Sequence, residues 1–200
     1  EAELRKSESR YRMLFNSFND AVFVNPYIPG TSGGKFAEVN DVACQWLGYT
    51  REELMEMTSD DIEAPEIRYR MDEVLRRLES ERRVIFESQH VTKNGRRIPV
   101  EISSQIFSWS GQPMVISVAR DLSLRKNLEE MRQAMDGAIH IISRLVETKD
   151  PYTAQHQRRV CELSLAIGRK LNLSPWQLDG LRVAGLLLDI GKLYIPMEIL

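Results

Sequence analysis

The chain has 200 residues, enough for one or two domains. Hydrophobic residues make up 42% of it and charged residues 28%, which are ordinary values for a globular protein and exclude a disordered chain. The formal net charge of −2 leaves no basic excess to attract nucleic acid, so we expect no nucleic-acid partner. No apolar run approaches the length of a membrane span.

Cysteine usage and the first residue bear on the compartment. Cys44 and Cys161 lie far apart and form no CxxC pair, which is typical of a reducing environment, so we expect a cytoplasmic chain. The sequence begins at Glu1 inside a charged helical pattern and without a methionine, as an internal segment does. An upstream membrane anchor therefore stays open as an alternative.

The hydrophobic period divides the first part of the chain. Residues 1–18 carry apolar side chains at helical spacing, which predicts an N-terminal helix. Residues 19–122 then show two short strand patterns, short helices and three longer strand patterns, with Asn94-Gly95 as a strong hairpin signal. That order predicts an α+β domain built on an antiparallel sheet.

The period changes after Asp121. Over three heptad repeats the apolar positions are spaced alternately by four and three residues: Leu124, Leu128, Met131, Met135, Ala138, Ile142 and Leu145. The pattern predicts a connector helix over residues 123–148 that forms a coiled coil. We expect a homodimer through a seam of four of these residues: Leu128, Met131, Met135 and Ile142. The alternative is one amphipathic helix packed on its own domain. Residues 149–200 show only helical signals and predict an all-α region.

Three segments of the first domain carry a family resemblance. Residues 38–54 read EVNDVACQWLGYTREEL, residues 93–101 read KNGRRIPVE, and residues 120–126 read RDLSLRK. Together they resemble the PAS family of sensor domains. The resemblance implies a curved five-stranded antiparallel sheet with flanking helices, which holds a small ligand or forms a dimer interface.

A small-molecule signal would bind in a pocket of such a domain. The candidate lining consists of five apolar or aromatic side chains: Phe23, Trp46, Phe86, Ile102 and Ile116. The ligand is unknown, and the alternative is a domain without one. For Trp46, core packing is the simpler interpretation.

We expect neither flavin nor haem in this domain. Cys44 lies outside the Asn-Cys-Arg segment that is typical of flavin-linking PAS domains, so we interpret it as a buried small apolar residue. Residues 59–80 contain no histidine, the residue that haem-binding PAS domains often place there. His90 lies in a strand pattern, and we interpret it as a surface or pairing residue.

Two segments of the helical region carry a second resemblance. Residues 150–160 read DPYTAQHQRRV, and residues 186–196 read LLLDIGKLYIP. Both resemble signature segments of HD-GYP domains, which hydrolyse cyclic dimeric GMP with two or three metal ions. The resemblance implies that His156 is a metal ligand, that Asp189 is a bridging ligand and catalytic residue, and that Lys192 faces the substrate phosphate.

The helical region departs from that family at one ligand position. Leu188 stands where the family has histidine, and a leucine cannot ligate a metal. His156 and Asp189 alone form an incomplete site, because zinc and iron sites need three or more protein ligands. We expect no metal in this chain, and Fe or Mn only in a full-length parent. The alternative roles are structural: Leu188 packs on a helix face, Asp189 caps a helix and His156 hydrogen-bonds.

The two resemblances together predict a bacterial signal-transduction module. A PAS-type sensor and dimerisation domain would regulate an HD-GYP-like output domain in cyclic-di-GMP signalling, with cyclic-di-GMP as the ligand of an intact output domain. One alternative is an active metal-dependent phosphodiesterase in the full-length parent. The other is a degenerate HD domain that acts only as a binding scaffold. Leu188 argues against catalysis by this chain.

Overall fold

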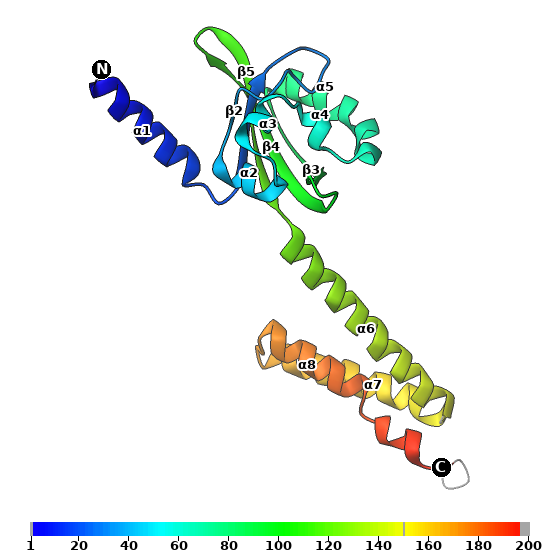
Figure 1. Ribbon diagram of the computed structural model, residues 1–200. Coiled ribbons are helices and arrows are strands. Elements are labelled where there is room, and N and C mark those ends of the chain that lie inside the picture. The colour runs from blue at the N-terminus through cyan, green and yellow to red at the C-terminus, as the bar shows by residue number, and fades with distance from the viewer. Residues whose placement is uncertain (1, 150, 197–200) are drawn as a thin grey trace. The chain divides into compact units, whose positions relative to one another are not determined.

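The computed structural model describes residues 2–149 and 151–196 (Figure 1). The chain divides into two compact units, Glu1–Lys126 and Asn127–Leu200. Among the helices of the described ranges, none combines the length and the apolar character needed to cross a bilayer.

The first unit is an α+β domain with five antiparallel strands in the order β2-β1-β5-β4-β3. The strands are β1 Ala21–Pro26, β2 Glu38–Val39, β3 Arg83–Val91, β4 Arg97–Trp109 and β5 Gln112–Asp121. The helices are α1 Ala2–Asn16, α2 Asp41–Leu47, α3 Arg51–Met55, α4 Ser59–Ile62, η1 Pro65–Arg70 and α5 Met71–Glu81. This architecture confirms the predicted fold class.

Local sequence signals explain where these elements begin and end. Asn40 is fully buried, and its Oδ1 accepts hydrogen bonds from the backbone of Ala43 at 3.0 Å and of Val22 at 2.9 Å, so it caps α2 and holds β1. Gly48 ends α2 at φ 74°, a left-handed conformation that glycine adopts without strain. Thr50 caps α3 in a capping box with Glu53.

The two faces of the sheet bury different clusters. Helices α2 to α5 lie on one face (Figure 1), and the core there includes Phe23, Leu47 and Leu54. The cluster on the other face is smaller, and there Phe15 of α1 packs with Val24 and Met114. Because side chains alternate along a strand, β1, β4 and β5 each contribute to both clusters.

The second unit is helical: α6 Ser123–Lys149 enters it at Asn127 and is followed by α7 Pro151–Lys170, α8 Pro175–Leu186 and the short helix η2 Ile190–Tyr194. Helices α7 and α8 pack closely, because a Cβ added at Gly185 would lie 2.9 Å from the Cβ of Cys161. Ion pairs join Asp136 of α6 to Arg182 of α8, and Glu147 of α6 to Arg158 of α7 at 3.3 Å.

Helix α6 has a buried face and an exposed apolar face. Ile139 and Val146 are buried. The expected seam residues Leu128, Met131 and Met135 are largely exposed, and Ile142 is half-buried. Among the described residues, therefore, the first part of the seam keeps most of its apolar surface exposed.

Candidate functional site

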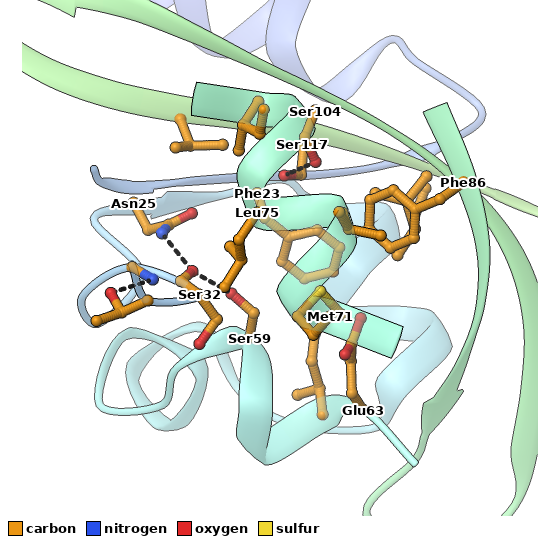
Figure 2. A pocket seen from close by; sticks show the side chains of 18 of the residues that line it. Phe23, Asn25, Ser32, Ser59, Glu63, Met71, Leu75, Phe86, Ser104 and Ser117 are labelled. Atoms are coloured by element: carbon orange, nitrogen blue, oxygen red, sulfur yellow. Dashed lines mark hydrogen bonds between the residues drawn. The ribbon is translucent and has the colours of Figure 1, made fainter. Parts of the chain in front are cut away.

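A cavity of about 60 Å³ lies in the first unit between the sheet and helices α4 and α5 (Figure 2). The sheet supplies the apolar residues Phe23, Phe86, Ile102, Val115 and Ala119. The helices supply Ile62, Met71, Val74, Leu75 and Leu78. The space has room for several waters or for a ligand of a few nonhydrogen atoms.

Three of the five expected lining residues border this cavity, namely Phe23, Phe86 and Ile102. Trp46 does not, because α2 directs it to the edge of the main core and to a surface groove. Ile116 does not either, since Val115 and Ser117 of β5 face the cavity and alternation turns Ile116 to the opposite face, beside Phe15.

Two serines form a polar site on the part of the cavity wall that the sheet supplies. Ser104 of β4 and Ser117 of β5 are direct cross-strand partners, and their hydroxyl oxygens lie 2.8 Å apart (Figure 2). Ser104 is buried and Ser117 is half-buried. Their strand neighbours on the same face are apolar, so the pair interrupts a hydrophobic wall.

Buried polar groups also fix one end of the cavity. The Asn25 side-chain amide donates to the carbonyl of Ser32 at 3.3 Å, and the Ser59 hydroxyl donates to the same carbonyl at 3.1 Å (Figure 2). Gly33 adopts φ 100°, and a Cβ there would lie 1.9 Å from the Asn25 amide nitrogen. The 26–34 loop therefore closes against the cavity only with glycine at position 33.

Glu63 and His90 border the cavity, and both are buried. The Ser88 hydroxyl donates to Glu63 Oε1 at 3.1 Å. The His90 ring meets Phe23 edge to face, with centroids 5.8 Å apart. Burial lowers the pKa of His90 to about 4, so the imidazole is neutral at pH 7.

His90 corrects the expectation of a surface residue, since only 4% of it is exposed, although it does pair with Ile98 of β4. The signal for its burial was present in the sequence. Val84, Ser88 and His90 lie on one face of β3 at a period of two. Two of the three are polar, so the apolar pattern that predicts a buried face is interrupted. Cys44, expected to be buried, is half-buried against the core, and burial raises its thiol pKa.

The residues that the HD-GYP resemblance assigns to a metal centre lie on α7 and just after α8. His156 is exposed on α7, and no hydrogen bond or ion pair joins it to Asp189 in the described part of the chain. Asp189 lies 3.7 Å from the ammonium of Lys192. Leu188 follows α8 and is 53% exposed, so about half of its surface remains outside the packing on a helix face that was the alternative role.

The donor set therefore does not fit a metal centre. Among the residues that the structure describes, no group of three or more His, Cys, Asp or Glu could hold a metal ion. Two candidate ligands with a leucine between them fall short of the three or more that zinc and iron need.

Comparisons with known proteins divide the chain in the same way. A family profile for the PAS domain matches residues 19–123, and one for the HD domain matches residues 140–200. A methyl sulfide methyltransferase-associated sensor of Methanosarcina acetivorans is 33% identical over 135 residues, which are 68% of this chain and 13% of the relative.

Two further similarities concern the separate parts. A cyclic di-GMP phosphodiesterase of Pseudomonas aeruginosa is 42% identical over 55 residues, which are 28% of this chain and 13% of the relative. The PAS domain of an HTR-like protein from Haloarcula marismortui superposes with a TM-score of 0.50 at 24% identity, covering 60% of this chain and 95% of that one. That likeness shows the fold alone. The chain spans 13% of the length of both curated relatives named here.

The pKa of His90 predicts a pH dependence of stability. Between pH 6.5 and about 4, His90 is protonated in the unfolded chain but stays neutral in the native chain. The free energy of unfolding therefore falls as the pH is lowered through this window. When the pH is lowered from 7.5 to 5, the free energy of unfolding of the unmodified chain should fall by about 2 kcal/mol more than that of His90→Gln. Denaturant titrations followed by tryptophan fluorescence measure the difference.

The matched control is His140→Gln, which changes an exposed histidine on α6 and should keep the pH dependence of the unmodified chain. Equal losses in the unmodified chain and in His90→Gln would contradict a buried neutral imidazole.

Proposed function

The chain belongs to the PAS domain family, whose profile matches more than half of it, and from this premise we propose that it is a ligand-sensing and dimerising module that regulates an HD-type output domain. In a full-length parent the output would act in cyclic-dinucleotide signalling. Two similarities support this assignment: the relative from Methanosarcina acetivorans is named as a sensor, and the one from Pseudomonas aeruginosa as a cyclic di-GMP phosphodiesterase.

The observation that carries the proposal is that one strand borders the cavity and leads into the connector. β5 contributes Val115, Ser117 and Ala119 to the cavity lining. The chain then passes through the buried Leu122 and starts α6 at Ser123. A ligand that shifts β5 therefore acts on the first turn of α6 without any further element between them.

The first turn of α6 is fixed to the sheet by several bonds. The backbone N–H of Leu122 donates to the carbonyl of Pro99 at 2.9 Å, and the Asp121 carboxylate accepts from the N–H of Ser123 at 2.6 Å. Lys126 forms an ion pair with Glu87 of β3 at 3.0 Å. Because these bonds come from residues of β3, β4 and β5, a change in the curvature of the sheet changes the direction in which α6 leaves it.

Helix α6 is the proposed dimer interface and signal carrier. Its exposed apolar face follows the heptad spacing, and burying it against the same face of a second chain removes apolar surface from water. The buried face of α6 belongs to the helical unit, where Asp136 pairs with Arg182 of α8. A rearranged seam thus acts on α8 through the helix that both faces share.

The helical region has two alternative roles in a full-length parent. An active phosphodiesterase using Fe or Mn needs ligands beyond His156 and Asp189. A degenerate domain that only binds a partner or a cyclic dinucleotide needs none. Leu188 in place of the family histidine favours the second role, so regulation through binding is the proposal for this chain.

Filling the cavity tests the coupling to the connector. Ala119→Leu adds side-chain volume inside the cavity, whereas Val118→Leu on the same strand adds it on the opposite face. We expect Ala119→Leu to change the dimer dissociation constant by about five-fold or more, the lower range of allosteric coupling energies. Sedimentation of both variants measures it. The same dissociation constant in both would contradict the coupling.

The seam itself is tested at its centre. Met135→Glu places two carboxylates opposite each other across a dimer and should weaken it more than about ten-fold, since charges are costly to bury. Met135 is 61% exposed in the single chain, so the substitution should leave folding within about 0.5 kcal/mol. Analytical ultracentrifugation measures the dimer.

The control for this variant is Gln133→Glu, which adds the same charge outside the seam on the same helix. It should dimerise as the unmodified chain does. An unmodified chain that sediments as a monomer at tens of micromolar, roughly the useful assay range, would show that the seam does not dimerise.

The incomplete metal site predicts the absence of catalysis. The purified chain with added manganese or iron should not hydrolyse cyclic di-GMP, because two candidate ligands cannot hold a metal cluster that activates water. Leu188→His adds one ligand and should give no turnover either. Chromatography of the nucleotide products is the assay, with an active phosphodiesterase run in parallel. Metal-dependent turnover by the unmodified chain would contradict the proposal.

A further inference from the structure

We infer that the cavity takes a small uncharged molecule, largely apolar, whose single oxygen acceptor is bound by the Ser104–Ser117 pair. The inference rests on the proposed sensing function and names the chemical class of the ligand.

The serine pair holds a hydrogen-bond donor that the protein does not use. Two hydroxyl groups carry two donor protons, and the 2.8 Å bond between Ser104 and Ser117 uses one of them. Neither hydroxyl has another hydrogen-bond partner among the described residues. The second proton therefore needs an acceptor from within the cavity, which the hydroxyls border together with Phe23 (Figure 2).

The position of the pair makes this donor directional. Along the cavity face of β4 and β5 the cross-strand pairs on either side are Ile102 with Ala119 and Ile106 with Val115. At the β4–β5 part of this wall a ligand oxygen can accept from the serines, while its carbon atoms contact aliphatic and aromatic groups. Leaving a buried donor without an acceptor costs about 1–3 kcal/mol. A ligand with an acceptor oxygen therefore binds more tightly than a hydrocarbon of the same size.

The charges around the cavity exclude anionic ligands. The described lining residues include no Lys or Arg that could pair with an anion, and one of them, Glu63, is a buried carboxyl group. His90 offers no positive charge at pH 7, because burial keeps its imidazole neutral. A carboxylate or phosphate brought into this space would lose its hydration without a counter-charge.

A cationic ligand is also disfavoured. The Glu63 carboxyl group accepts a hydrogen bond from Ser88 at Oε1 over 3.1 Å, and its Oε2 atom is buried as well. An ammonium group brought into this space would pair with Glu63 only after desolvation, and that cost can exceed the Coulombic gain of a buried pair. The cavity volume of about 60 Å³ further limits the ligand to a few nonhydrogen atoms.

Three probes with a similar carbon chain and different charge test the ligand class: butanone, butyrate and butylammonium at pH 7. The readout is the NMR titration of the methyl groups of Ile102, Val115 and Ala119 in the full chain. We expect butanone to bind at least about ten-fold more tightly than either ion, since burying a charge costs more than that factor. Butyrate or butylammonium binding as tightly as butanone would overturn the inference.

Serine variants test the recognition of the oxygen. The double substitution Ser104→Ala with Ser117→Ala removes both partners of the bond and should weaken butanone binding about five-fold, the value of one hydrogen bond. Ser103→Ala is the control, because Ser103 lies on the opposite face of β4. Unchanged affinity in the double variant, or no shift of the cavity methyl groups with any probe, would overturn the inference. Either result leaves the proposed coupling to its separate test with Ala119→Leu.

Discussion

The pairing of β5 with β1 on one side and β4 on the other is the constraint on which the remaining structure depends. This register fixes which residues of β5 face the helices and which face α1. It places Ser117 opposite Ser104 and turns Ile116 to the other face. Because the chain leaves β5 directly into α6, the same strand joins the wall of the cavity to the connector.

Much of the fold could be predicted from local signals. The strand patterns, the Asn94-Gly95 turn and the caps at Asn40 and Thr50 each act over a few residues, so they are legible in the sequence. The cavity was predicted only in part, because whether a residue such as Ile116 faces it depends on register between strands distant in sequence. His90 was misplaced for a different reason: its polarity conceals a face that tertiary contacts bury.

The helical unit shows why a motif does not by itself define a centre. His156 and Asp189 match positions of a metal-binding signature, yet the described residues bring no third donor to them. Leu188 removes one ligand, and its side chain is largely exposed. Within the unit, ion pairs join α6 to both α7 and α8.

Occupation of the cavity should alter the start of α6. Hydrogen–deuterium exchange of the full chain with and without saturating butanone tests it directly, because exchange reports local opening residue by residue. We expect changed protection both in β5 and in the first turns of α6, residues 123–128. Protection that changes only in the strands and helices lining the cavity, with α6 unaffected, would contradict it.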